Sequence, residues 1–287
     1  MLRPSAFFGL IVLAVAIGQQ VPVLLISHSL GVVAVAVFAT SRTLTGLVRQ
    51  FVSLLSSATW TDLTRLETQG DTERLSSALR ILVATSMIAV VSLAGILWFD
   101  VAAILAFWTN GRIVADLGLL QLMLLHLVVQ TLWMSASNVP AATNRHRSLA
   151  ISYIASNVIA VALSALLLPS LGLNAIPLSF IAADLMACYH FVIRDACRIS
   201  AIPYAGYMIK IVTGSVAMIA GVWAVALAVH AAIPGAIVAR LTTLSLLLPP
   251  IVASVAWFFL LMAEDRQRVA AWKGRMLLRR RFSEPAR

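Results

Sequence analysis

Charged residues and cysteine are both scarce in this chain. Aspartate, glutamate, lysine and arginine make up 11% of the 287 residues, against 61% hydrophobic residues. A soluble domain has about a quarter charged residues, so this composition excludes a water-soluble globule, and disorder needs the opposite bias. Two cysteines, Cys188 and Cys197, are too few for a disulfide-stabilised scaffold. The mean hydropathy of +0.97 indicates a membrane protein.

Long stretches without charged residues predict the membrane-spanning helices. A transmembrane helix needs about 20 mostly apolar residues. Two of the uncharged stretches are long enough for more than one helix, and turn signals divide them at 27–31 and at 169–172. We therefore predict an all-α polytopic membrane helix bundle with eight transmembrane helices. The predicted spans are 5–26, 31–56, 81–99, 117–136, 149–168, 174–193, 207–230 and 239–262.

Lysine and arginine gather on one side of this predicted topology. With the N-terminus inside, 17 of the 21 basic residues fall in cytoplasmic segments and at their span edges. Only Arg112 and Arg240 fall outside, and Arg42 and Arg49 lie within the second span. This positive-inside bias predicts that both termini are cytoplasmic. We also predict that the first 26 residues are a retained helix rather than a signal peptide, because the apolar region is too long and no small-residue cleavage site closes it.

The tail, residues 264–287, carries 8 of the 21 basic residues. Basic runs beside a membrane span bind anionic lipid headgroups, and basic runs also bind nucleic acid. Aromatic residues do not alternate with the basic residues of this run in a way that would support nucleic-acid binding. We therefore expect a topology anchor that contacts membrane lipids, and no nucleic-acid partner.

Polar residues inside an apolar span are informative, because placing them there costs free energy. The second predicted span contains a stripe of them at helical spacing. An arginine near mid-depth costs about 2.5–3.5 kcal/mol on insertion scales, so Arg42 needs water, an anion or a carboxylate beside it. The stripe consists of Arg42, Thr45, Gly46, Arg49, Ser53 and Ser56.

Two interpretations of these arginines stay open. A guanidinium group matches the oxygens of a phosphate, which predicts an anion site. The alternative for Arg42 is a structural ion pair, with Asp184 of the sixth span as its partner. For Arg49 we favour a side chain that reaches the inner headgroup region.

The remaining polar residues at depth give weaker signals. Amides can contact a ligand, although hydrogen bonds between helices are the favoured explanation. Asp184 is a candidate for ion coupling as well as for a structural pair. His126 has no evident carboxylate partner, so we expect it to pack between helices. The candidate amides are Gln19, Gln20, Gln130 and Asn157.

The motifs of several enzyme classes are missing from the sequence. It contains no phosphate-binding glycine loop, no His-Glu-x-x-His and no Gly-x-Ser-x-Gly. The outward acids Asp100 and Asp116 form no evident acid–base pair, and the predicted outer loops are short. We therefore expect a protein that is not an enzyme and has no cofactor or metal.

Two segments resemble a known family. They are LGVVAVAVFATSRTLTGLVRQFVSLLSSATWTDLTRL, over 30–66, and NRHRSLAISYIASNVIAVALSALLLPSLGLNAIPLSFIAADL, over 144–185. Both are similar to the polysaccharide exporters of the multidrug/oligosaccharidyl-lipid/polysaccharide superfamily, which include O-antigen and exopolysaccharide flippases. The resemblance covers about residues 5–193. It implies two six-helix lobes around a cavity and transport of a polyprenyl-diphosphate-linked oligosaccharide, with Arg42 in SRTL as a cavity arginine that contacts diphosphate or an acidic sugar.

The number of spans departs from that family. Its members have twelve to fourteen spans, and this chain has eight in our prediction. By resemblance, residues 1–193 form the second lobe, 194–263 an extra helix pair and 264–287 the tail. The first lobe is absent, so the chain is a fragment or half-size member, pairs with a separate first-lobe chain, or forms a homodimer.

Together with the polar stripe, the resemblance implies a multi-pass transporter of lipid-linked oligosaccharide in polysaccharide biosynthesis, located in a bacterial inner membrane. Arg42 and Arg49 are the expected phosphate contacts, and the four amides are expected to contact sugar. The alternatives are a non-transporting membrane scaffold of a glycan-assembly complex and a small-molecule antiporter of the same superfamily. The antiporter needs an acid within the membrane, and Asp184 is the candidate.

Overall fold

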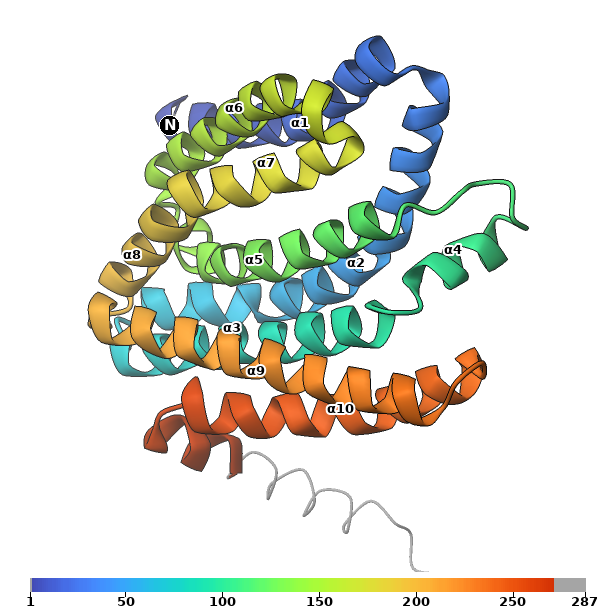
Figure 1. Ribbon diagram of the computed structural model, residues 1–287. Helices are drawn as coiled ribbons and strands as arrows, with labels where there is room; N and C mark the ends of the chain where they lie inside the picture. The colour runs from blue at the N-terminus through green and yellow to red at the C-terminus, as the bar shows by residue number, and fades with distance from the viewer. Residues whose placement is uncertain (1, 271–287) are drawn as a thin grey trace, which may run out of the picture.

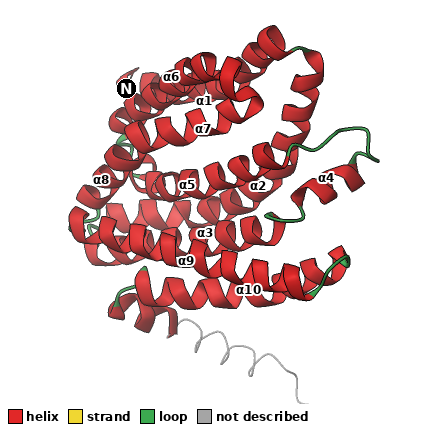
Figure 2. Ribbon diagram, viewed as in Figure 1, coloured by secondary structure: helices red, strands yellow, loops and turns green. Residues whose placement is uncertain are grey.

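The computed structural model describes residues 2–270, and the part of the chain that it describes contains helices and no strands. Long helices are joined by short connections (Figure 2). Residues 263–270 are helical as well, whereas 271–287 of the predicted basic tail lie outside the described residues. The helices are α1 (Leu2–Leu30), α2 (Val32–Thr68), α3 (Thr72–Leu97), α4 (Val101–Trp108), α5 (Leu117–Ala142), α6 (His146–Leu171), α7 (Ala175–Ala183), α8 (His190–Ile199), α9 (Tyr204–Ala232) and α10 (Ile237–Phe259).

Seven helical stretches within the described residues are long and apolar enough to cross a membrane, which makes the chain a multi-pass membrane protein. One of them, His146–Ile199, contains a chain reversal, because α6 ends at Leu171 and α7 packs back against it. The seven stretches are Gly9–Leu30, Val32–Thr68, Thr72–Leu97, Leu117–Ala142, His146–Ile199, Tyr204–Ala232 and Ile237–Phe259.

Single glycines make the two reversals that the sequence placed at short turn clusters. α1 continues through 27–29, and the chain turns at Gly31, where φ is 84°. α6 likewise continues through Pro169 and stops at Gly172, where φ is 55°. Glycine adopts this left-handed region without the penalty that a Cβ atom brings. The turn signal was therefore correctly located but too wide.

Residues 57–80 were predicted as a cytoplasmic loop with a helix that starts after Asp71 and runs into the third span. That helix is present, but α2 also extends into the loop, which corrects the predicted end of the second span at 56. α2 runs on to Thr68, and α3 begins at Thr72. The Asp71 side chain caps α3 by accepting a hydrogen bond of 3.0 Å from the backbone N–H of Arg74. Hydropathy marks where a helix leaves the apolar layer, whereas capping residues mark where the helix itself ends.

The helices form successive layers (Figure 1). α1 packs on α6, and α6 packs on α7. α2 and α5 form the next layer, and both pack against α3. On the far side, α9 and α10 pack against each other and against α3. This order places α2 and α5 between the α1–α6–α7 group and the rest of the bundle.

Successive long helices alternate in direction through the bundle (Figure 1). The connections α2–α3, α5–α6 and α8–α9 lie at one end, together with the start of α1 and the end of α10. The connections α1–α2, α6–α7 and α9–α10 lie at the other end, where α4 also projects. The described chain therefore begins and ends on the same side of the bundle.

Two buried ion pairs join the C-terminal part of the bundle to α3 and to the segment that follows α3. Near the end that carries α4, Arg240 donates from Nε to Asp100 at 3.2 Å and also makes a second contact through Nη2. At the opposite end, Arg80 donates to both carboxylate oxygens of Asp265, at 2.6 and 2.8 Å. Asp116 caps α5 by accepting from Leu119 N–H at 3.0 Å. Both outward acids are therefore occupied by structural contacts.

Candidate functional site

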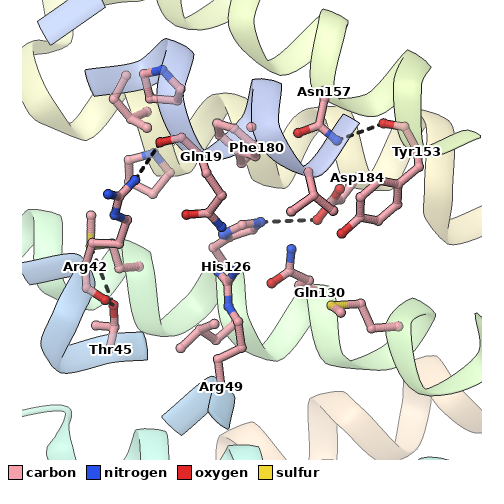
Figure 3. A pocket seen from close by; sticks show the side chains of 18 of the residues that line it. Gln19, Arg42, Thr45, Arg49, His126, Gln130, Tyr153, Asn157, Phe180 and Asp184 are labelled. Atoms are coloured by element: carbon pink, nitrogen blue, oxygen red, sulfur yellow. Dashed lines mark hydrogen bonds and ion pairs between the residues drawn. The ribbon is translucent and has the colours of Figure 1, made fainter. Parts of the chain in front are cut away.

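A cavity of about 270 Å³ lies between α1, α2, α5, α6 and α7. Its walls combine apolar side chains with polar and charged ones. Figure 3 shows these polar side chains converging from several helices. The polar residues that line it are Gln19, Arg42, Thr45, Arg49, His126, Gln130, Tyr153, Asn157 and Asp184.

Most of the site residues expected from the sequence meet in this cavity. Gln19, Arg42, Arg49, Gln130, Asn157 and Asp184 all line it. Gln20 does not, because successive helical residues point about 100° apart, and its side chain is exposed. Of the predicted stripe on α2, Arg42, Thr45 and Arg49 face the cavity. Ser53 lies beyond it, exposed, and donates to the backbone oxygen of Gln50.

Arg42 is held at the cavity wall by the backbone of α1. Its Nη1 donates a hydrogen bond of 2.7 Å to the carbonyl oxygen of Gln19. Its guanidinium carbon lies 5.5 Å from the ring centroid of Phe38, within cation–π range. The alternative pairing with Asp184 is not formed in the structure, because both oxygens of that carboxylate have other partners. Among the described residues, Arg42 therefore has no carboxylate partner and can still offer donors to a ligand.

Arg49 also points into the cavity (Figure 3), which corrects the expectation that it reaches the inner headgroups. Its Nε is buried and has no hydrogen-bond partner among the described residues. Asp184 lies within electrostatic range and attracts the guanidinium group, whereas Arg42 repels it. Seven residues separate the two arginines, so both occupy one face of α2. An unpaired cationic donor facing a cavity is suited to an anion.

His126 was expected to pack between helices without a partner, and this is wrong. Its Nε2 lies 3.2 Å from Oδ2 of Asp184, and both side chains are buried. The other carboxylate oxygen accepts a hydrogen bond of 2.7 Å from Ser156 Oγ. The pair joins α5 to the π-helical segment Asp184–Tyr189, and such segments often occur at functional sites. No local sequence signal pairs residues 58 positions apart.

Two amides complete the polar lining. Gln130 is 8% exposed, and its Oε1 has no hydrogen-bond partner among the described residues. The Nδ2 of Asn157 donates to the backbone oxygen of Tyr153 at 2.8 Å. Gly18 permits this arrangement, because a Cβ atom there would lie 2.0 Å from Asn157 Oδ1. Trp133 also lines the cavity and has an unpaired Nε1, a donor that the sequence reasoning did not consider.

The charges that line the cavity do not balance. Arg42 and Arg49 contribute two positive charges, and Asp184 contributes one negative charge. His126 adds another positive charge when it is protonated. Within residues 2–270, no group of three or more histidine, cysteine, aspartate or glutamate side chains has the arrangement of a metal site. The geometry therefore suits an anion that also accepts and donates hydrogen bonds.

Comparison with known proteins gives no relative for this chain. No family model matches it, and neither a curated protein nor a solved structure does.

Proposed function

We propose that this chain is the cavity-forming lobe of a transporter for a lipid-linked oligosaccharide that carries a diphosphate. It crosses a bacterial inner membrane eight times, with both termini in the cytoplasm. The alternating helix directions and the common side of the described ends support this topology (Figure 1), as does the basic bias of the cytoplasmic segments. Transport also needs a second lobe, supplied by a longer form of this chain, by another copy or by a separate chain.

The excess positive charge of the cavity carries this proposal. A diphosphate diester bears two negative charges, and Arg42 and Arg49 offer two guanidinium groups on one helix face. Arginine forks match phosphate oxygens, and each charge-assisted hydrogen bond contributes about 1.5–3 kcal/mol. The amides of Gln130 and Asn157 border the same space and are suited to sugar hydroxyls. The apolar outer faces of the helices leave the prenyl chain in lipid.

Binding of a dialkyl diphosphate to the protein in lipid nanodiscs tests the anion site. Arg42→Gln and Arg49→Gln are each expected to weaken binding about 10- to 100-fold, which corresponds to one lost charge-assisted contact. Arg147→Gln is the matched control, because Arg147 is exposed on α6 and does not line the cavity. Unchanged affinity in both cavity variants would refute the proposed site.

The oligomeric part of the proposal has its own measurement. Native mass spectrometry of the protein in lipid nanodiscs reports the assembly and any retained lipid at once. A dimer or a complex that carries a polyprenyl-diphosphate glycan is the expected result. A monomer that retains only phospholipid would count against a transporter built from two lobes.

A small-molecule antiporter is the second candidate, favoured by one observation. Asp184 is an acid within the helix bundle, is 3% exposed and lines the cavity. In such an antiporter a cationic substrate and protons compete for the carboxylate, so substrate binding weakens as the pH falls. Asp184→Asn would then abolish binding of a cationic substrate, whereas it leaves an anion site intact.

A further inference from the structure

The His126–Asp184 pair is a titratable group that the anion site itself does not require. Both residues line the cavity, at 9% and 3% exposure. Oδ1 of Asp184 accepts a hydrogen bond of 2.7 Å from Ser156, and Oδ2 lies 3.2 Å from Nε2 of His126, which donates to it when Nε2 carries a proton. An aspartate with two such partners is arranged as an ionised acceptor, and it orients the imidazole ring beside it.

Ionisable and aromatic side chains surround the pair from four elements of the fold. From α2, Arg49 lies within electrostatic range of Asp184, and Arg42 lies within range of Arg49. From α6, Tyr153 lines the cavity within electrostatic range of Asp184, and Cys188 of the π-helical segment also lies within that range. Phe180 of α7 covers the imidazole, with ring centroids 5.6 Å apart. Among these groups, only an imidazole has an ordinary pKa near neutral pH.

We infer that the His126–Asp184 pair is a proton site that fills together with the anion site, so that an anionic diphosphate and one proton bind cooperatively. This inference rests on the proposed anion-binding function. His126 is the proton acceptor, and Asp184 is the positioning residue that holds the ring and stabilises its charged form.

The direction of the coupling follows from charge alone. With neutral His126, the two arginines and Asp184 give the cavity a net charge of one positive unit. Protonation of His126 raises this to two units, which equals the charge of a diphosphate diester in magnitude. The bound dianion therefore favours the protonated imidazole, and by linkage the proton favours the dianion. Transport with the proton site filled therefore moves one proton together with the substrate.

Calorimetric titration with a short P1,P2-dialkyl diphosphate tests the coupling. This diester keeps a constant charge over the neutral range, so any proton that moves belongs to the protein. The titration uses the protein in lipid nanodiscs between about pH 6 and 8, where a histidine titrates. Two buffers of different ionisation enthalpy give the number of protons taken up.

Wild-type protein is expected to take up as much as one proton and to bind up to about tenfold more tightly for each unit of falling pH. His126→Gln is expected to retain binding but lose both the uptake and the pH dependence. Asp184→Asn keeps the imidazole and serves as the second variant. It removes a negative charge from the cavity, so it is expected to bind more tightly at high pH and to take up its proton at lower pH. His190→Gln is the control, because His190 contacts Tyr204 outside the cavity.

Four results would overturn the inference, and they differ from one another. Wild-type affinity that does not change with pH, or a pH dependence that survives in His126→Gln, leaves the anion site standing without its proton site. Diphosphate affinity that falls as the pH falls shows that the proton and the anion oppose each other, which refutes cooperative binding. No binding at any pH removes the anion site, and the coupled proton site with it.

Discussion

Replacement of Asp265 by asparagine is expected to lower the free energy of unfolding by about 3–5 kcal/mol. Arg80 is 5% exposed and Asp265 is 0% exposed, and two short hydrogen bonds join them. The substitution leaves the Arg80 guanidinium buried without its counter-charge, which is the costly case for a buried pair. The contact joins α3 to the segment after α10, so its loss frees the end of α10 from the bundle.

The two buried free cysteines, Cys188 and Cys197, provide the assay. A thiol-reactive dye labels them only as the protein unfolds, in detergent or nanodiscs, during a thermal or denaturant titration. Asp62→Asn is the matched control, because the Arg65–Asp62 pair is 3.7 Å apart and 67% exposed on both sides. Such exposed pairs contribute about 0–1 kcal/mol. A cost below about 1 kcal/mol for Asp265→Asn would show that water or lipid headgroups compensate Arg80, and the reasoning would be wrong.

The same pair makes stability depend on pH. Burial works against the ionised form of Asp265, but the hydrogen bonds from Arg80 and from the backbone N–H of Met262 outweigh it and lower the pKa. A carboxyl whose pKa is lower in the folded state stabilises the fold at pH values above its unfolded pKa of about 3.9. This stabilisation is lost as the pH falls through the folded pKa. The difference between wild type and Asp265→Asn should therefore be constant near neutral pH and shrink in acid. A difference that persists unchanged into strong acid would contradict the assignment.

Two further substitutions test the packing and the caps. Gly18→Ala is expected to push the Asn157 side chain into the cavity and break its bond to the backbone, at a cost of about 1 kcal/mol, with weaker diphosphate binding in the same titration. Gly221→Ala is the control, because a Cβ atom there meets nothing within 4 Å. It should be neutral or stabilising by up to about 1 kcal/mol. Equal effects at both sites would refute the close approach of Gly18 to Asn157. Asp71→Ala removes the cap of α3 and should cost about 1 kcal/mol by the thiol assay, and a smaller cost for Asp71→Asn is the check that the side-chain oxygen matters.

Features of the fold that depend only on residues close together in the sequence could be predicted. The scarcity of charge and the length of the apolar runs predicted a helical membrane protein. Asp71 marked the start of α3, because a cap acts within three residues. The end of α2 was misplaced, because its last turns contain polar residues and no strong stop signal precedes Gly70. The short helix α4 was also not expected, since eight residues carry little periodicity.

The candidate site could be predicted only in part. Arg42 and Arg49 share a face of α2 because helical periodicity fixes their direction, and that is a local property. His126 was misjudged because its partner Asp184 is 58 positions away and reaches it through the packing of α5 against the segment after α7. The carbonyl of Gln19 was overlooked as the partner of Arg42, since any helix can offer a backbone oxygen to a long side chain.

The low charge and the long apolar runs were enough to predict that the protein lies in a lipid bilayer and that its secondary structure is helical. Backbone groups in a bilayer must be paired within the segment, so long uncharged runs become helices. The tertiary structure alone decided which polar side chains share one space. Arg80 meets Asp265 across 185 residues, and Arg240 meets Asp100 across 140. Among the described residues, neither Arg42 nor Arg49 forms such a close ion pair with a carboxylate. Those pairings depend on how helices pack, which no local pattern encodes, and they leave the excess positive charge in the cavity.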